Sequence, residues 1–526
     1  MVGCGASTIP PAEPEEQGQT PQRGGSFQMV SNRGLSHLHP VNQPGSNAGS
    51  YLTGGVYEQL VDWEYKAEED WRFASKIAPE IAERWEQPDP AMYVFQIRKG
   101  VKWHDGQSLT GRDVAWSYQY IADPANKLPA GINLKAMESI TAVDDYTVRL
   151  KLKEPDVDFL KKLTNQSRLS ILPKHVHERG DSFEKVAIGS GPFKLESFQP
   201  DRDVVYSPNR EYWKADRPYL DRWRMLAPAD EAGRTAAFFA GQNDVLKVAA
   251  RPQVDAVLTQ NKQARLSIFV QENNVEMWLK LNKPPFIDQR VRQAVHLAVD
   301  RQAMVSTLTA GDGLVNPPGI NALYRAWALP AALVEGMPGW RTPKEQDLAR
   351  AKQLLIEAGH GQGLSFTIKI DRNNPNWPQV AEMISAQLRP IGVDAKLQPL
   401  ESGVLAKAFI DGDYDAIVES SSSVGDWPNR LHSRGVENTM PIRDAELDRL
   451  IEAQAREFDE TKRALVIRDI QQLLLRQAYT IPTITFPGYL LQQPWVHGFV
   501  DNGGALPNNN DWGQLWVNQG QLPGNR

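Results

Sequence analysis

The sequence predicts a mixed α/β protein with more than one domain. At 526 residues the chain is long enough to form two or three separate hydrophobic cores. In the C-terminal half, apolar residues alternate strictly from Leu364 to Ile370 and then recur at helical spacing from Val380 to Leu388. A second alternating segment follows at Val393 to Leu397. This order predicts two parallel strands joined by a right-handed helical crossover.

The N-terminal half is predicted to contain more strand. Ser26 to Val30 reads as the first strand, and Tyr93 to Ile97 as another that leads through a turn towards a helix. Thr110 and Asp113 have the spacing of a capping box at the start of that helix. Val143 to Lys153 alternates between apolar and charged residues and predicts one half-buried strand.

The remaining helices of the C-terminal half have start signals in the sequence. Asp288 and Asp300 are placed to cap two successive helices, the second ending near Gly311. Thr342-Pro343 with Glu345 predicts a capping box with proline at the first helical position. Further along, the pattern predicts a strand, two amphipathic helices and a last strand, at Tyr414 to Glu419, Asp444 to Arg456, Thr461 to Gln477 and Ile481 to Phe486.

The composition does not indicate a nucleic-acid-binding protein, a disulfide-linked protein or a protein with a thiolate metal site. The formal net charge is −6 and the pI is about 5.9, which gives no reason to expect nucleic acid or an anionic membrane surface as a partner. Cys4 is the only cysteine, so no intramolecular disulfide or thiolate metal site can form. His37 and His39 lie two residues apart, but no third ligand is near them in the sequence, and we expect surface histidines. No cofactor is predicted.

The N-terminus has the features of an anchored tether. Met1-Val-Gly-Cys4-Gly resembles the end of a bacterial lipoprotein signal, in which the cysteine is lipidated, although the basic and apolar segment that should precede it is missing. The alternative is that Cys4 is incidental. Residues 1–23 are rich in Pro, Glu, Gln and Gly and predict a disordered tether. No other segment is apolar enough to span a bilayer.

Two long strings carry a family resemblance. The first runs from Arg98 to Val114 and reads RKGVKWHDGQSLTGRDV, and the second, from Asn282 to Arg301, contains PPFIDQRVRQAVHLAVDR. Shorter strings agree with them: YEQLV from Tyr57, LPKH from Leu172 and GSGPF from Gly189. Together they resemble the family 5 extracellular solute-binding proteins, the peptide- and nickel-type receptors of ABC importers.

The resemblance implies an architecture. It is that of the two-lobed periplasmic-binding-protein fold (type II, cluster C), an α/β fold with an extra subdomain in the first lobe. We expect residues 24–277 to form lobe I, with the subdomain at about 60–185, residues 278–483 to form lobe II, and residues 484–526 to return to lobe I. The hinge is expected at Leu279 to Leu281 and in the strand from Ile481, and the protein is expected to be a monomer.

Candidate ligand-binding residues follow the strand from Tyr414. Open α/β sheets bind ligands beyond the carboxyl ends of their strands, and Ser420 to Asn429 is a Ser/Gly-rich loop at such a position, with Ser422, Asp426 and Trp427 as candidates. In the family's peptide receptors an acid in this region pairs with the amino terminus of the peptide. Asp426 corresponds best to it, the alternative being a turn aspartate that binds its own backbone. Asn32, Arg33 and Trp278 complete the set of candidates.

The predicted function is that of a receptor that closes on an extracytoplasmic ligand and delivers it to an ABC permease and its ATPase. Such a protein is periplasmic or held at the membrane by a lipid alone. An oligopeptide is the preferred ligand, and an oligosaccharide stacking on Trp427, Trp278 or Trp63 is the alternative. A peptide- or sugar-hydrolysing enzyme is the rival class, but the sequence contains neither G-x-S-x-G nor H-E-x-x-H.

Overall fold

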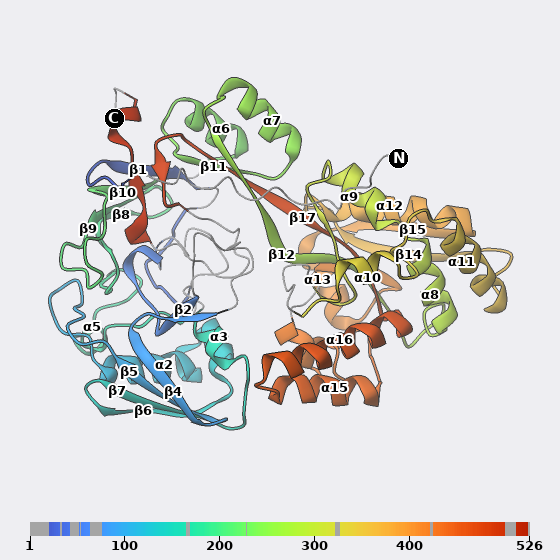
Figure 1. Cartoon of the computed structure of the whole chain (residues 1–526), viewed down its shortest axis with the longest axis horizontal. Helices are drawn as coiled ribbons and strands as arrows, with labels where there is room; N and C mark the ends of the chain where they lie inside the picture. Colours follow the sequence, from blue (N-terminus) through green and yellow to red (C-terminus); the bar gives the residue numbers. More distant parts are fainter. Residues whose placement is uncertain are drawn as a thin grey trace. The chain divides into compact units, whose positions relative to one another are not determined.

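The chain divides into two compact units in the computed structural model (Figure 1). The structure describes residues 20–31, 34–42, 52, 54–63, 76–164, 169–227, 229–320, 327–420, 424–499 and 512–523. One unit contains Val270–Pro487, and the other contains Pro10–Phe269 together with Gly488–Arg526. Two strands, β12 (Arg265–Leu279) and β17 (Thr480–Gln492), carry the chain from one unit to the other. The boundaries expected from the sequence, after Met277 and after Thr483, fall inside these two strands.

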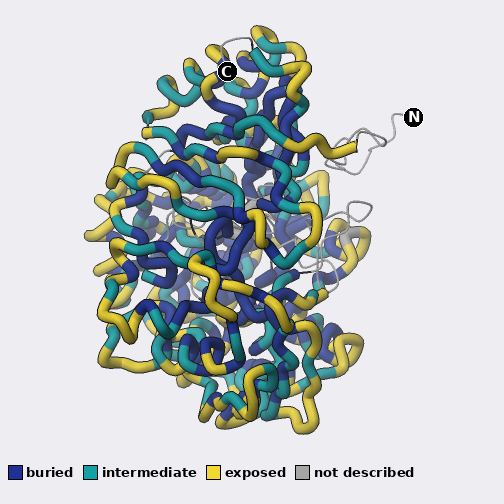
Figure 2. Tube along the Cα trace, turned by 90° about the vertical axis from the view of Figure 1, so that its left-hand side faces the viewer, coloured by how far each residue is buried: buried dark blue, intermediate teal, exposed yellow. Residues whose placement is uncertain are grey.

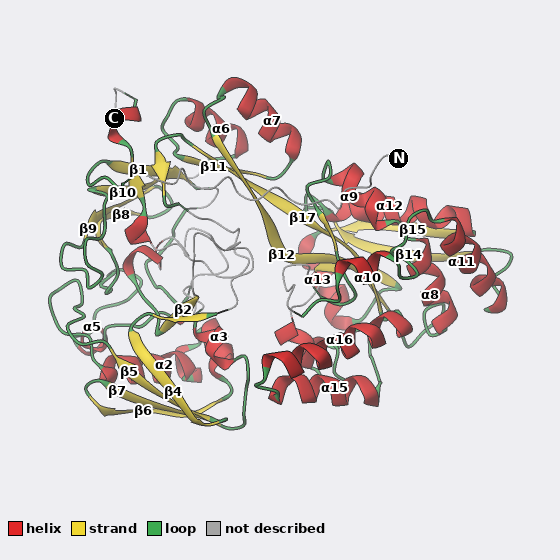
Figure 3. Cartoon of the chain, in the orientation of Figure 1, coloured by secondary structure: helices red, strands yellow, loops and turns green. Residues whose placement is uncertain are grey.

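The Val270–Pro487 unit is built on a mixed sheet, which confirms the predicted α/β class. Its strand order is β17-β12-β16-β14-β15, and β14 pairs in parallel with both β15 and β16. The helix between β14 and β15 is therefore the predicted crossover, and it lies next to β15 (Figure 3). The bounds are β13 (Leu314–Val315), β14 (Leu364–Asp371), α12 (Trp377–Leu388), β15 (Val393–Leu400), α13 (Ser402–Asp411) and β16 (Ala416–Ser420).

Helices cover both faces of this sheet. One hydrophobic cluster joins the sheet to α8, α9, α11 and α12, and a second joins the opposite face to α13, α15 and α16. Figure 2 shows the buried residues in dark blue, enclosed by exposed residues in yellow. The bounds are α8 (Gln289–Ala298), α9 (Arg301–Leu308), α10 (Ala331–Glu335), α11 (Glu345–Glu357), α14 (Trp427–Arg430), α15 (Ala445–Arg456) and α16 (Glu460–Gln477).

Two of the predicted helix caps are confirmed and one is wrong. Asp288 accepts the backbone N–H of Arg290, and Asp300 accepts that of Ala303. The predicted cap at Thr342-Pro343 does not form, because α11 begins two residues later, at Glu345. Its first turn is fixed by Asp347, a fully buried carboxylate that is bound by surrounding donors. These are the Gly339 N–H at 2.9 Å, Arg341 Nε at 2.6 Å and Lys344 Nζ at 3.1 Å.

Two arginines of the second family-like string donate hydrogen bonds to backbone carbonyls. Arg301 is 2% exposed and donates to the carbonyls of Pro482 at 2.7 Å, Val299 at 3.1 Å and Gly339 at 2.5 Å. Arg292 donates to Gln477 O at the end of α16, at 3.0 Å. A guanidinium suits this role because its donors point in several fixed directions.

The other unit contains two four-stranded sheets. The first has the order β1-β10-β9-β8, and the second the order β4-β5-β7-β6, with α2 packed on β6 and β7. The predicted capping box of α2 is present, with Asp113 accepting the Thr110 N–H at 2.9 Å. The bounds of the sheet strands are β1 (Ser26–Val30), β4 (Ala82–Asp89), β5 (Met92–Ile97), β6 (Met137–Asp144), β7 (Thr147–Leu152), β8 (Phe193–Gln199), β9 (Asp203–Pro208) and β10 (Arg222–Leu226).

Shorter elements complete this unit. They are β2 (Val61–Trp63), β3 (Ile77–Pro79), α2 (Gly111–Ala122), α3 (Phe159–Leu163), α5 (Lys174–Glu178), α6 (Glu231–Phe239), β11 (Val245–Val248), α7 (Arg251–Gln260), β18 (Val496–His497) and β19 (Trp516–Val517). Residues of the C-terminal segment, such as Trp512 and Val517, belong to the same hydrophobic cluster as Phe27 of β1.

The prediction of one strand from Val143 to Lys153 is wrong in its first part. Residues 137–144 form β6, and the chain turns before it pairs back as β7. Asp144 makes the turn by accepting the N–H of Tyr146 at 2.7 Å, a local bond that aspartate favours. The alternation from Val148 to Leu152 is as predicted, with buried apolar residues and exposed charges.

The first family-like string is tied to two of the shorter ones through His104 and Asp105. Its ring Nδ1 accepts the Gly189 N–H at 3.2 Å, and its Nε2 lies 3.0 Å from Gly191 O. The ring is therefore neutral with its proton on Nε2, and burial lowers the pKa of His104 to about 4. Asp105 binds His175 of the LPKH string at 2.7 Å.

Candidate ligand-binding site

The sequence-predicted site residues are only partly covered by the described structure. Asn32, Arg33 and Ser422 lie outside the described residues, as does Cys4 with most of the expected tether. Trp278, Asp426 and Trp427 are described, and all three belong to the Val270–Pro487 unit. The predicted role of these residues in ligand binding stays a prediction.

The carboxyl ends of three parallel strands meet at one edge of the sheet in this unit. Strands β14, β15 and β16 end at Asp371, Leu400 and Ser420. The segments after β14 and β15 are tied together, because Arg372 N donates to Leu400 O at 2.9 Å and Asn373 Nδ2 to Glu401 Oε2 at 2.9 Å. Beyond such an edge, α/β proteins bind their ligands.

Three carboxylates from neighbouring strands gather at this edge. Glu419 of β16 stands directly opposite Glu276 of β12 in the antiparallel register, and Glu276 is only 2% exposed. Burial raises the pKa of Glu419, and the charge of Asp371 on β14 raises it further. The charge of Arg430 opposes these effects and lowers the pKa of Glu419, so the edge combines three carboxyl groups with the Arg430 guanidinium.

These acids were missed in the sequence because nothing local marks them. Glu419 follows the apolar run from Ala416 to Val418, and Glu276 lies between Val275 and Met277, so each charged residue reads as the polar face of a strand. They become neighbours only through the pairing of β12 with β16, which joins segments far apart in the chain.

Asp426 lies at the surface, after β16 and immediately before α14. Its side chain is exposed and makes no capping hydrogen bond to α14. An exposed carboxylate near the end of a parallel strand is accessible to a ligand, as the sequence-based hypothesis requires.

The two tryptophans lie in the hydrophobic core. Trp427 is 0% and Trp278 1% exposed, and both belong to the cluster beneath α13, α15 and α16. The Trp278 ring lies 5.3 Å from Phe409, and the guanidinium of Arg430 lies 5.5 Å from the centre of that ring. Neither ring presents a face to solvent in this structure, so packing is the role that is observed.

Arg430 links the end of β16 to the helix that follows. Its Nη1 lies 3.4 Å from Ser420 O, and its Nε donates to Glu437 at 3.0 Å. Together with its position over Trp278, these contacts fix α14 against the sheet. Arg430, like these three acids, was not predicted from the sequence.

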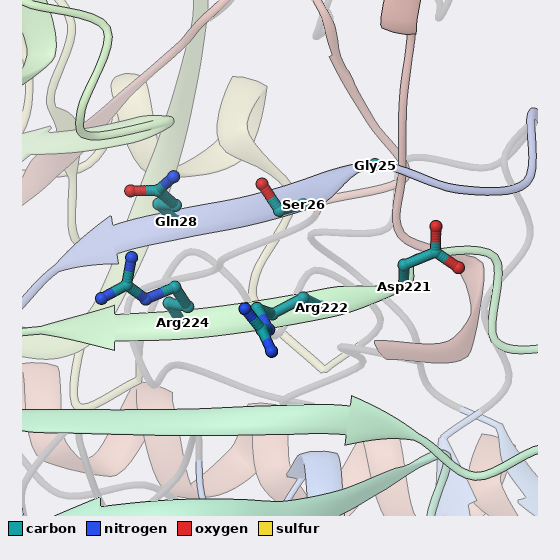
Figure 4. Close-up of a pocket in the computed structure, with 6 residues that line it drawn as sticks. All are labelled: Gly25, Ser26, Gln28, Asp221, Arg222 and Arg224. Atoms are coloured by element: carbon teal, nitrogen blue, oxygen red, sulfur yellow. The ribbon is translucent and has the colours of Figure 1, made fainter. Parts of the chain in front are cut away.

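A separate pocket of about 430 Å³ lies on β1 and β10 of the other unit (Figure 4). Gly25, Ser26 and Gln28 line it from β1 and the residue before it, and Asp221, Arg222 and Arg224 line it from the β10 side. Each charged lining residue already has an ion-pair partner: Asp221 with Arg210, Arg222 with Glu196 and Arg224 with Asp203. We therefore place no ligand recognition in this pocket.

Within the described ranges, no three His, Cys, Asp or Glu side chains are grouped so that they could hold a metal ion. The backbone N–H of His39 donates to His37 Nδ1 at 3.2 Å. Among the helices that the structure describes, none combines the length and apolar character needed to cross a bilayer.

Comparison with known proteins decides the family. Residues 76–433 match the model of the bacterial extracellular solute-binding proteins, family 5 (middle). The chain belongs to this family. It is similar to the oligopeptide-binding protein AppA of Bacillus subtilis, with 27% identity over 86% of this chain and 84% of the relative. It is also similar to the heme-binding protein A of Haemophilus influenzae, with 27% identity over 85% and 84%.

A solved structure agrees with the fold of this family-5 protein. HbpA2 from Haemophilus parasuis superposes with a TM-score of 0.79 and 26% identity, covering 94% of this chain and all of that one. The predicted two-lobed fold is thereby confirmed, and the family is one of solute-binding proteins rather than enzymes.

Proposed function

We propose that this family-5 protein is the substrate-binding receptor of an ABC importer and that its ligand is an oligopeptide. The observation that carries the peptide assignment is the similarity to an oligopeptide-binding protein along most of both chains. The carboxyl groups of Glu276, Glu419 and Asp371 at the sheet edge support it, because a peptide brings an amino terminus that can bind to a carboxyl group whereas a neutral sugar does not.

In this proposal the receptor works by lobe closure. Strands β12 and β17 serve as the hinge, since they carry the chain from one unit to the other. Closure around a peptide removes water from its polar contacts and strengthens them, a common ligand-driven transition. The closed receptor, a monomer, then docks on a permease and its ATPase. Cys4 carries a lipid that holds the receptor at the outer surface of the membrane.

A thermal-shift screen of the purified protein tests the ligand class. The panel comprises di- to hexapeptides, cello-, xylo- and manno-oligosaccharides, nickel and haemin. A ligand at a hundred times its dissociation constant adds about 2.7 kcal/mol to the free energy of unfolding, which is readily measured. We expect a shift with peptides. A shift with sugars or haemin alone would refute the peptide assignment while leaving the receptor function intact.

Mass spectrometry of the denatured protein completes the screen. A peptide carried through purification would occupy the site and suppress the shift, and it would be released on denaturation. Absence of both a shift and a released small molecule would contradict the proposal.

A further inference from the structure

Strand β17 passes from one hydrophobic core to the other within a few residues. Phe486 belongs to the cluster of the Val270–Pro487 unit, whereas Leu490 belongs to the cluster of the other unit. The division between the two units falls between these residues, after Pro487 and before Gly488. The side chains of β17 therefore change from one core to the other at the pair Pro487-Gly488.

This pair is unusual in the interior of a buried strand. Every residue of β17 is buried, but proline has no N–H to donate to a sheet and glycine has no side chain to pack. Two partners of β17 also end here. β13 pairs with Ile484 and Thr485, and β11 pairs with the segment from Tyr489 to Gln492. Neither of these two strands pairs with Pro487 or Gly488.

The second crossing strand meets β17 at this point. On β12 the division between the units falls after Phe269, a residue that is 3% exposed and belongs to the same cluster as Leu490. A Cβ on Gly488 would overlap Cζ and Cε2 of the Phe269 ring. The ring therefore lies against the backbone of Gly488, and both residues belong to one unit. The two places where the chain leaves this unit are in contact with each other.

We propose that Pro487-Gly488 is the pivot of lobe closure and that Gly488 turns against the Phe269 ring. This inference rests on the proposed receptor function. Hinges consist of a few residues that absorb changes in φ and ψ, and glycine allows the widest range of both angles. The missing N–H of Pro487 means that no hydrogen bond donated there has to break. Pro482, the other proline of β17, is held in place because its carbonyl accepts a hydrogen bond from the buried Arg301.

Hydrogen–deuterium exchange of the full-length protein without ligand tests where the pivot lies. Backbone amides exchange when the structure around them opens locally. We expect the amide of Gly488 to exchange at least about tenfold faster than those of Ile484 and Leu491, after correction for intrinsic rates, although all three residues are buried. Equal protection along β17 would overturn the proposal. This readout needs neither a variant nor a bound peptide.

The variant Gly488→Ala tests the function of the pivot. Closure is measured as the distance between spin labels on Lys185→Cys and Lys352→Cys, exposed positions in the two units, in a Cys4→Ser background. The otherwise unchanged protein should close with a peptide found in the screen. Gly488→Ala should close less and bind that peptide about tenfold more weakly, since fewer molecules reach the closed state.

A second substitution shows whether the ring is part of the pivot. Phe269→Val removes the atoms that the new methyl group would overlap, so Phe269→Val with Gly488→Ala should recover closure and affinity. Wild-type closure and affinity in Gly488→Ala alone, or no recovery in the double variant, would contradict the proposal. If the protein without either substitution failed to close with every ligand of the screen, the proposed receptor function would be refuted instead.

Gly55→Ala is the matched control. A Cβ on Gly55 would lie 2.6 Å from Cζ3 of Trp223, so this variant also presses a methyl group against a buried ring, but away from β17. It should lose thermal stability and keep the peptide affinity and the closure of the wild type. An equal loss of affinity in Gly55→Ala would attribute the effect of Gly488→Ala to stability and overturn the pivot.

Discussion

The indole N–H of Trp213 donates to Glu58 Oε1 at 2.8 Å, although 155 residues separate the two in the chain. The same carboxyl group binds Ser190, and His104 binds Gly189 and Gly191 nearby. The family-like strings that contain Glu58, His104 and Gly189 thus meet at buried polar contacts in one unit. Their residue types are explained by packing and hydrogen bonding in that unit rather than by ligand chemistry.

His104 should make the folded protein sensitive to acid. The folded state holds the ring neutral, with a pKa of about 4 against an ordinary value of 6.5. Its contribution to stability is therefore complete above pH 6.5 and is lost as the pH falls towards 4. Chemical denaturation should show that the free energy of unfolding falls less between pH 7 and pH 5 in His104→Gln than in the wild type. His360→Gln, a variant of a histidine on a loop, is the control and should lose as much as the wild type.

Arg301→Lys should destabilise the protein strongly. An ammonium group cannot reproduce the several directions in which the guanidinium donates, and buried carbonyls of Pro482, Val299 or Gly339 would be left without a donor. We expect a loss of about 2–4 kcal/mol in the free energy of unfolding, measured by urea denaturation. Arg350→Lys, an exposed residue, should change it by less than about 0.5 kcal/mol. Equal losses in both variants would contradict this role.

Gly189→Ala and Gly403→Ala should have opposite effects on the stability of the protein. A Cβ on Gly189 would lie 1.8 Å from Val56 O, so the backbone must move, and we expect a loss of more than about 2 kcal/mol. A Cβ on Gly403 meets nothing within 4 Å, and this exposed glycine lies in α13, where alanine is favoured by about 0.5–1 kcal/mol. Thermal unfolding of the two variants checks the pair.

Asp426→Asn tests the predicted contact with the amino terminus of a peptide. If the carboxylate pairs with that amine, the variant should weaken peptide binding by about 1.5–3 kcal/mol, as expected for a hydrogen bond to a charged group. Titration calorimetry with a peptide found in the screen measures it. Asp411→Asn, an exposed acid on α13, is the control. An affinity equal to that of the wild type would remove Asp426 from the site.

Trp427→Ala distinguishes packing from ligand stacking. The ring is fully buried, so its removal should leave a cavity and cost about 3–5 kcal/mol of stability. A role in stacking on sugars predicts instead a loss of oligosaccharide affinity with little change in stability. Thermal unfolding and binding measurements on the same sample separate the two.

Local features of this fold were determined by the sequence alone. The alternation from Leu364 to Ile370, the crossover helix from Trp377 and the caps at Asp288 and Asp300 lie where the sequence predicts them. Each depends on residues within a few positions of one another, so periodicity and capping chemistry are sufficient. The family resemblance, which extends over nearly the whole folded chain, could also be recognised from the sequence without a structure.

Other features were decided only by the tertiary structure. The first turn of α11 starts at Glu345, where the Asp347 carboxylate is fully buried and the carbonyl of its partner Gly339 accepts from Arg301, 38 residues earlier in the chain. Glu276 and Glu419 face each other because β12 pairs with β16, and Trp278 and Trp427 are in the core because helices cover that face of the sheet. The local sequence cannot specify such arrangements, since burial and charge proximity depend on segments that meet only when the chain has folded.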